Sequence, residues 1–327
     1  MDKNTALSKS NMTSSVFLRR SANILGENVM IIFIIILAIA LSFLNKNFMT
    51  VQNMLNVLRQ LSYVGIIAIG MTFVILSAQI DLSVGSVAAL AGMMFGVLFR
   101  DFGAPWPLAL AGAIFAGIVV GLINGTFVAY LRIPAFVVTL GMMTILRGAV
   151  LLMSQGRSIG PYPDKFVWIG TGFVFGLPFP TILLIIMLIV GFIALKYSIF
   201  GRYVYAIGGN PEAARLSGVN VKKFSLIVFL IVSFAAALAG IVMTARLNSS
   251  VPSLGDGMEM DAIAAVCVGG TSLYGGRGSI LKTIVGALIM TLIRNGLNIL
   301  RVSTWWQLVV VGLILIVAVY SSTRREK

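Results

Sequence analysis

The sequence contains no histidine and only one cysteine, Cys267, among 327 residues. The absence of histidine excludes imidazole metal ligands, histidine acid–base catalysis and histidine proton relays. A single cysteine excludes an intramolecular disulfide and a thiolate metal cluster. Because Cys267 lies within an apolar run, we interpret it as a small packing residue.

Charge is also scarce: charged residues make up 10% of the chain, hydrophobic residues 59%, and the mean hydropathy is +1.02. An ordinary soluble domain has about 25% charged residues, so this composition predicts a polytopic membrane protein. The formal net charge of +14 comes from basic residues scattered singly between apolar runs. Without a basic face that carries interleaved aromatics, we expect no nucleic-acid partner and interpret the charges as loop charges that orient the chain in a bilayer.

Apolar runs of the length needed to cross a bilayer, about 17–25 residues, occur eight times. Two more segments, 84–99 and 261–273, are shorter or interrupted by glycine. The sequence therefore predicts an all-α polytopic membrane protein with about ten transmembrane helices. We expect a cytoplasmic N-terminal segment over 1–28, a transmembrane domain over 29–321 and a cytoplasmic tail over 322–327. The eight clear spans are 29–44, 61–79, 107–131, 134–153, 178–197, 222–247, 279–300 and 304–321.

The distribution of Lys and Arg predicts the orientation. With a cytoplasmic N-terminus and ten spans, the inner segments carry about twice as many Lys and Arg residues as the outer segments. Both termini are then cytoplasmic, and so is the polar segment 201–221. The longest outer loop, 154–177, contains "GPYPDKF" and is expected to consist of turns.

An inverted repeat is one explanation of two similar segments, "GIVVGLINGTFVAYLRIP" (117–134) and "GALIMTLIRNGLNILRVS" (286–303). Each lies downstream of an Asp at a predicted membrane edge, Asp81 or Asp261. In the ten-span topology the two segments cross the bilayer in opposite directions, as in an inverted 5+5 repeat. Chance similarity between Gly- and Leu-rich helices is the competing explanation.

Uncharged polar residues and one embedded carboxylate are the candidates for lining a transport path. Asp81 and Ser83 are best explained as N-caps of a helix that begins at Val84, with direct substrate contact as the alternative. Asp261 is likewise interpreted as a cap. Asn side chains both donate and accept hydrogen bonds, which suits hydroxyl-bearing solutes, although bonds between helices explain them as well. The candidate pore-lining residues are Thr72, Asp81, Ser83, Asn124, Thr139, Asn295 and Asn298.

No segment carries the motif of a nucleotide site. "GGTSLYGGRGS" (269–279) is rich in glycine, but it lacks the Gly-Lys-Ser/Thr ending of a phosphate-binding loop. No nucleophile–base pair is evident elsewhere, so we expect no enzymatic activity and no cofactor bound by this chain. Energy for transport must then come from another subunit or from an ion gradient.

The polar stretch "GGNPEAARLSGVNVKK" (208–223) predicts a short helix between two spans. Asn210 is a good N-cap, Pro211 fits the first helical position, and Glu212 suits the positive end of the helix. The helix continues through Ala213, Ala214, Arg215 and Leu216, and Gly218 supplies its stop. So short a helix is marginal by itself, so we expect a partner to dock on it. A connector packed only against this chain is the alternative.

Four motifs in order resemble the membrane permease of bacterial ribose-type ABC sugar importers: "GMTFVILSAQIDLSVGS" (70–86), "GRYVYAIGGNPEAARLSGVNV" (201–221), "DAIAAVCVGGTSLYGGRGS" (261–279) and "NGLNILRVSTWWQ" (295–307). The resemblance covers the chain from about residue 40 onward. It implies that Glu212, Ala213, Ala214 and Gly218 form the EAA-x3-G core of a coupling helix that docks on an ATPase. The hydrophobic-Leu-Pro ending of other permeases is missing at 226–231, which fits the sugar and branched-chain amino-acid branch.

The resemblance further implies a homodimeric pore in the bacterial plasma membrane, ATPase subunits that bind ATP and Mg²⁺, and an extracytoplasmic sugar-binding protein. It favours a monosaccharide substrate, with ribose first and xylose, galactose, inositol or a furanosyl signal molecule as alternatives. An ion-coupled secondary transporter is the rival from another class. It is disfavoured because the chain has one well-embedded carboxylate and no histidine.

Overall fold

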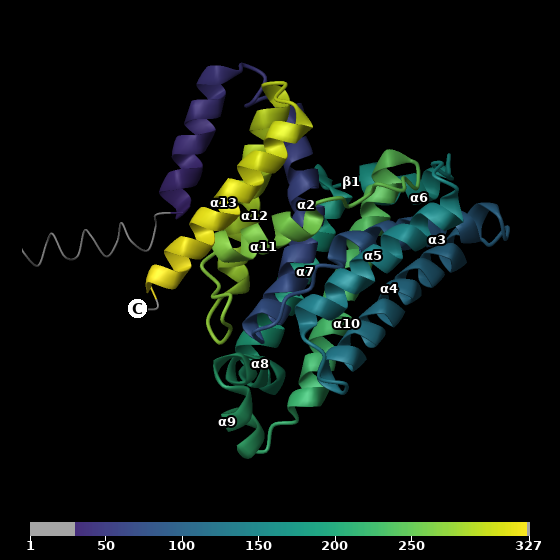
Figure 1. Ribbon diagram of the computed structural model, residues 1–327. Coiled ribbons are helices and arrows are strands. Elements are labelled where there is room, and N and C mark those ends of the chain that lie inside the picture. The colour runs from purple at the N-terminus through teal and green to yellow at the C-terminus, as the bar shows by residue number, and fades with distance from the viewer. Residues whose placement is uncertain (1–29, 326–327) are drawn as a thin grey trace, which may run out of the picture.

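A computed structural model describes residues 30–325, which form a helical bundle with one very small β-hairpin (Figure 1). The predicted segment 1–28 lies outside these residues, whereas 322–325 continue the last helix. In chain order the elements are the helix Met30–Leu44, α2 (Val51–Leu76), α3 (Val84–Arg100), α4 (Trp106–Ala129), α5 (Ala135–Ser154), α6 (Asp164–Thr171), β1 (Phe173–Val174), β2 (Leu177–Pro178), α7 (Phe179–Tyr197), α8 (Ile199–Gly209), α9 (Pro211–Leu216), α10 (Val221–Leu247), α11 (Met258–Val268), α12 (Ile280–Ile299) and α13 (Thr304–Arg325).

Six of these helices are long and apolar enough to cross a membrane, which makes the chain a multi-pass membrane protein: α2, α4, α5, α7, α10 and α12. Three shorter apolar helices are Met30–Leu44, Val84–Arg100 and Thr304–Tyr320. The tenth predicted span, 261–273, is represented by α11, which has 11 residues. At 1.5 Å per residue α11 is about 16 Å long, shorter than a hydrocarbon core of about 30 Å. It therefore does not cross a bilayer as a helix.

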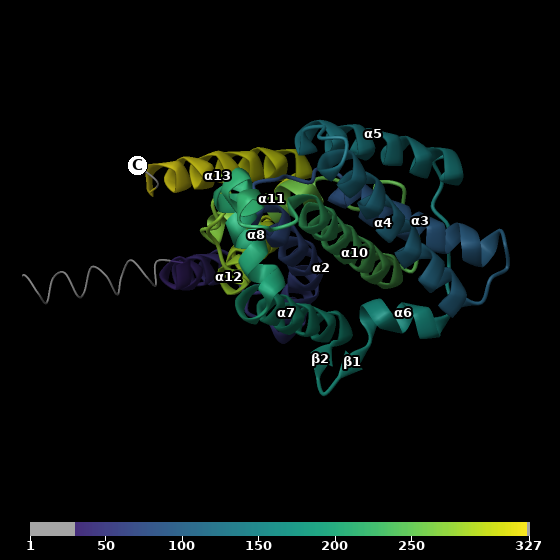
Figure 2. The ribbon, with the colours of Figure 1, turned by 90° about the horizontal axis from the view of Figure 1, so that it is seen from below.

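Helices α2 and α10 occupy the centre of the bundle, and Figure 2 shows them side by side between α7 on one edge and α5 and α13 on the other. α10 packs against α3 and α4, and α2 packs against α7, α11 and α12. Small residues permit these close crossings: a Cβ built on Gly240 of α10 would lie 2.2 Å from the Ala88 carbonyl oxygen of α3. In an apolar solvent such backbone approach, rather than hydrophobic exclusion, holds helices together.

Helix α2 starts ten residues before the predicted span 61–79. The Thr50 side chain accepts the Asn53 N–H and begins the helix, and the partly polar turns 51–60 precede the apolar run. The helix ends at Leu76 because Ala78 takes a left-handed φ of 59°. Hydropathy detected the apolar part of this helix and missed its polar beginning.

The Gly-Gly pair after α11 corrects the predicted span 261–273. α11 begins at Met258 and ends at Val268, and Gly270 has a φ of 82°. The residues that follow are irregular, yet Thr271 and Ser272 are buried. Irregular backbone at membrane depth is tolerated only inside protein, which matches this burial.

The loop 154–177, expected to contain only turns, holds helix α6 and the hairpin of β1 with β2. Phe166 of α6 stacks on Phe95 of α3 with ring centroids 3.7 Å apart, and the Tyr162 ring meets both edge-on. Aromatic contacts thus hold α6 on the bundle, a tertiary effect that turn residues do not reveal. Helix α8 is a second element that the sequence reasoning did not anticipate.

Candidate functional site

The short helix α9 has the capping geometry that its sequence predicts. The Asn210 Oδ1 accepts the N–H groups of Glu212 and Ala213 at 3.0 and 2.9 Å. Pro211 occupies the first helical position, and Gly218 follows the helix with a φ of 85°. The helix has the six residues that the sequence predicts, Pro211–Leu216, and is about 9 Å long. Its local structure is confirmed; its role in docking stays a prediction.

The outer face of α9 is available to a partner. Arg215 donates two hydrogen bonds to Glu212, Nε to Oε2 at 3.0 Å and Nη2 to Oε1 at 2.6 Å, and both side chains are exposed. These bonds and the charge of Arg215 hold the pKa of Glu212 below its usual value. Leu216 is 75% exposed, whereas Ala214 is buried. One face of the helix therefore packs on the protein, and the other presents an ion pair and an apolar side chain.

Helix α8 connects α9 mechanically to the centre of the bundle. A Cβ on Gly208 would lie 1.7 Å from the Leu76 carbonyl oxygen, so α8 touches the end of α2 directly. That same carbonyl accepts the Gly276 N–H at 2.9 Å, and the Tyr205 hydroxyl donates to the Gly278 carbonyl at 2.9 Å. The end of α2, the loop before α12 and the α8–α9 segment thus meet at one junction.

A groove of about 680 Å³ runs between α9 and the turn that joins α4 to α5. Glu212 and Arg215 line it from α9, Arg132 from the turn and Lys222 from the start of α10. The Lys222 ammonium lies 5.8 Å from the centre of the Tyr130 ring. The polar face of α9 is therefore continuous with a basic border.

Three predicted pore residues form a buried polar cluster. The Ser83 N–H and hydroxyl both donate to Asp81 Oδ1, at 2.7 and 2.6 Å, and the Asn124 amide donates to the Ser83 hydroxyl at 3.0 Å. All three are fully buried. Ser83 does occupy the N-cap position of α3, but its side chain makes no capping bond, and the Ser83 N–H is the one backbone N–H among the described residues that donates to Asp81. The expected cap is replaced by a link between the α2–α3 connection and α4.

Three other predicted pore residues lie in helix contacts. Thr72 Oγ1 lies 2.9 Å from Thr283 Oγ1, which joins α2 to α12. Asn295 exchanges two hydrogen bonds with Asn53, at 2.9 and 3.0 Å. The Thr139 hydroxyl bonds to the Ala135 carbonyl of its own helix at 2.9 Å and to the Ile80 carbonyl of the α2–α3 connection at 3.4 Å. Their pore-lining role stays a prediction.

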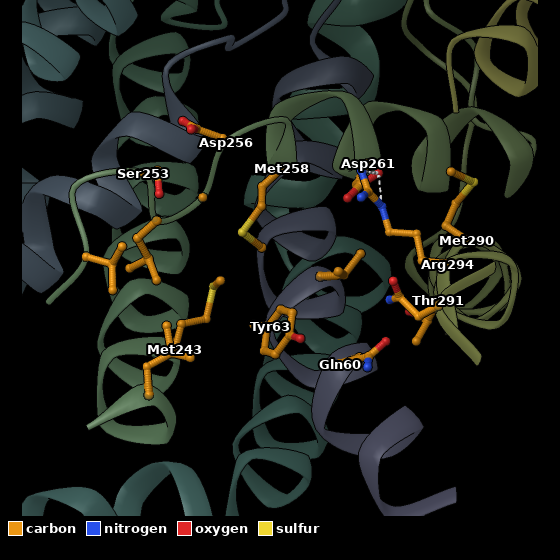
Figure 3. Close-up of a pocket in the computed structure, with 16 residues that line it drawn as sticks. Gln60, Tyr63, Met243, Ser253, Asp256, Met258, Asp261, Met290, Thr291 and Arg294 are labelled. Atoms are coloured by element: carbon orange, nitrogen blue, oxygen red, sulfur yellow. Dashed lines mark hydrogen bonds and ion pairs between the residues drawn. The ribbon is translucent and has the colours of Figure 1, made fainter. Parts of the chain in front are cut away.

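A polar cavity of about 380 Å³ lies between α2, α10, α11 and α12 (Figure 3). Its size lies within the range of about 300–1,000 Å³ that is usual for small-molecule sites. Among the seven candidate pore-lining residues, only Asn298 lines it. The other lining residues include polar groups from α2, α11, α12 and the α10–α11 connection, together with three methionines: Gln60, Tyr63, Met243, Ser253, Asp256, Met258, Asp261, Met290, Thr291 and Arg294.

An ion pair forms one wall of this cavity. Arg294 of α12 donates Nε–H and Nη2–H to Asp261 Oδ1 of α11, at 2.9 and 2.7 Å. The side chains are 22% and 6% exposed, so the pair is largely shielded from solvent. Across the cavity, the Arg246 guanidinium donates to the Tyr63 hydroxyl at 3.1 Å. The interpretation of Asp261 as a cap is wrong: Gly257 is the N-cap of α11, and Asp261 lies inside the first turn of the helix.

Sequence reasoning missed Gln60, Tyr63 and Arg294 as parts of one site. A usable signal existed for Arg294, because an arginine within a predicted span requires a buried partner, and Asp261 was the other carboxylate at a membrane edge. Gln60 and Tyr63 carry no comparable signal, since only the crossing of α2 with α12 places them opposite Arg294. Among residues 30–325, His, Cys, Asp and Glu form no group of three that could hold a metal.

These features define a multi-pass helical membrane protein with an exposed capped helix at one end and a polar cavity among its central helices. Residues 53–319 match the family model described as branched-chain amino acid transport system/permease component. The match covers most of the chain, so the protein belongs to this family of permease components. It is therefore a transport protein rather than an enzyme.

Curated relatives extend this comparison. The chain is 44% identical over 292 residues to the ribose import permease protein RbsC of Haemophilus influenzae, covering 88% of this chain and 90% of the relative. Identity to RbsC of Escherichia coli K12 is 40% over 307 residues, covering 92% and 95%. The xylose transport system permease protein XylH of Haemophilus influenzae is 33% identical over 373 residues, covering 95% and 100%. No solved structure matches the chain.

Proposed function

We propose that this protein is the pore-forming permease subunit of an ATP-driven, binding-protein-dependent importer of ribose. The identity of 40–44% to ribose permeases over about nine-tenths of the chain supports this substrate over xylose, because two xylose permeases are 33% and 35% identical. ATP and Mg²⁺ bind the partner ATPase subunits, and a sugar-binding protein delivers the solute from outside. Two copies of the permease form the pore in the bacterial plasma membrane.

The capped, exposed helix α9 is the observation that carries this proposal. A six-residue helix with a bidentate ion pair and an exposed leucine is unstable alone, and the structure supports it only on one side. Its other side suits a groove on an ATPase. The groove beside α9, with Arg132 and Lys222 on its border, extends the surface that such a partner could contact.

Transmission to the pore follows from the junction of α8 with α2. Closure of the ATPases upon ATP binding moves α9, and Gly208 passes this displacement to Leu76 because the two backbones are in contact. The Tyr205–Gly278 hydrogen bond passes it to the segment before α12. α2 and α12 then tilt together and open the path outward. ATP hydrolysis resets the inward-facing state.

The topology proposed with this function has ten membrane segments, of which α11, followed by the Gly-Gly turn and the buried Thr271 and Ser272, is the incomplete one. The excess of Lys and Arg in the inner segments supports a cytoplasmic location for both termini and for α9. Packing supports an inverted repeat: α10 contacts α3 and α4 as α2 contacts α11 and α12. Each half also has a polar link to its matched helix: Asp81 of the α2–α3 connection is linked through Ser83 to Asn124 of α4, and Asp261 of α11 is bonded to Arg294 of α12.

The double variant Glu212→Lys with Arg215→Glu tests the coupling role. It keeps opposite charges three residues apart in α9 but reverses what a partner meets. We expect ATPase copurification and ribose uptake to be lost. The matched control reverses exposed neighbours at the opposite end of the molecule, Arg100→Glu with Asp101→Lys, and should leave both unchanged. Wild-type levels of copurification and uptake in the α9 variant would show that the coupling assignment is wrong.

A further inference from the structure

We propose that the cavity between α2, α10, α11 and α12 is a sugar-binding subsite within each permease protomer, with Gln60 and the Asp261–Arg294 pair as its polyol-recognising groups. This inference rests on the proposed import of ribose. It adds that the permease itself makes specific hydrogen bonds to the sugar.

Several residues that line the cavity have hydrogen-bond donors or acceptors without a partner among the described residues. Arg294 uses Nε and Nη2 on Asp261 Oδ1, and within residues 30–325 neither Arg294 Nη1 nor Asp261 Oδ2 has a hydrogen-bond partner. Neither amide atom of Gln60 bonds to another described residue. Asn298 accepts a hydrogen bond from Gln307 through Oδ1, which leaves its Nδ2 free. The Tyr63 hydroxyl accepts from Arg246 and keeps its own proton to donate.

These groups match the chemistry of a polyhydroxylated ligand. Each sugar hydroxyl donates one hydrogen bond and accepts others, so it requires acceptors and donors side by side. Asp261 Oδ2 accepts, Arg294 Nη1 and Asn298 Nδ2 donate, and Gln60 does both. Figure 3 shows Gln60 and Thr291 below Arg294, with Met258 and Tyr63 beside them. The methionine and the ring provide apolar surface for the C–H faces of the sugar.

The mouth of the cavity fits delivery from outside. Ser253 and Asp256, in the connection between α10 and α11, are exposed at its rim, and Asn298 is exposed near the end of α12. In the proposed topology this connection faces the sugar-binding protein. Arg147 holds the rim through an ion pair with Asp256 at 2.8 Å and a hydrogen bond to the Leu254 carbonyl at 2.8 Å. A sugar released there meets the cavity first.

Equilibrium binding of radiolabelled ribose to the purified permease–ATPase complex, without the binding protein, tests the subsite. We expect saturable binding by the wild type and a Kd about two- to tenfold higher for Gln60→Leu, the loss of one net hydrogen bond. Gln52→Leu is the matched control, because Gln52 is exposed on the same helix and does not line the cavity. Its Kd should equal that of the wild type.

The outcomes separate the two proposals. If the wild-type complex imports ribose with its binding protein but binds none alone, or if Gln60→Leu and Gln52→Leu have the same Kd, the subsite is refuted and the importer stands. If the wild-type complex does not import ribose, the proposed function fails. A single symmetric gel-filtration peak that contains the ATPase subunits at the wild-type ratio establishes that each variant complex is folded and assembled.

Discussion

Removing Arg294 should destabilise the protein strongly, because its partner Asp261 is 6% exposed and would be left with a buried, uncompensated charge. Breaking a buried ion pair from one side typically costs about 3–5 kcal/mol. The loss of unfolding free energy in Arg294→Gln should fall in that range, since both of the hydrogen bonds that Asp261 Oδ1 accepts come from Arg294. Asp261→Asn should cost less, because the remaining Arg294 is 22% exposed and lines a cavity that water can enter.

The double variant Asp261→Asn with Arg294→Gln removes both charges and should recover most of the loss, as replacement of a whole buried pair is often nearly neutral. Unfolding of each variant can be followed at a natural residue. Cys267 is its single cysteine, lies on α11 and is 4% exposed, so a thiol-reactive dye labels it only upon unfolding. Denaturant titration of dye labelling in detergent gives the free energy of unfolding for each variant. Equal free energies of unfolding for Arg294→Gln and the wild type would refute this prediction. A double variant that is less stable than Arg294→Gln would refute it as well.

Two further predictions follow from backbone contact and from an exposed ion pair. Gly240→Ala should lower the free energy of unfolding by about 1–3 kcal/mol, because the added methyl group overpacks against the Ala88 carbonyl. Gly141→Ala is the control and should not lower it, because no atom lies within 4 Å of the added Cβ. Equal free energies of unfolding for the two variants in the same dye assay would contradict this prediction. The ion pair with Arg215 lowers the pKa of Glu212, so its contribution is present above the ordinary glutamate pKa of about 4.3 and is lost only as the pH falls through the lowered value. Carbon-13 NMR of the Glu212 carboxyl should therefore give a lower titration midpoint in the wild type than in Arg215→Gln, and identical midpoints would show that the pair does not form.

Much of the fold could be predicted because the bilayer requires long apolar helices. The predicted span 222–247 differs from α10 by one residue at one end, and 178–197 differs from α7 by one residue. Prediction was weaker where tertiary contacts decide structure. α6 depends on aromatic stacking against Phe95, and the polar start of α2 depends on a cap at Thr50.

The candidate sites divide in the same way. Capping is local: Asn210, Pro211 and Gly218 are adjacent in the chain, so their geometry follows from side-chain and backbone preferences within a few bonds. The cavity is not local, because Gln60 and Arg294 are separated by most of the chain. No spacing rule connects them.

The sequence by itself determined the class of protein, the approximate position of most membrane helices and the short capped helix, since hydropathy and capping act over one helix at a time. Only the tertiary structure decided that Asp261 pairs with Arg294 instead of capping α11, that α8 contacts the end of α2, and that a polar cavity opens among the central helices. These features depend on which helices cross and at what depth. Glycine and alanine set those crossings through backbone contact, a constraint that is satisfied only when the whole bundle is assembled.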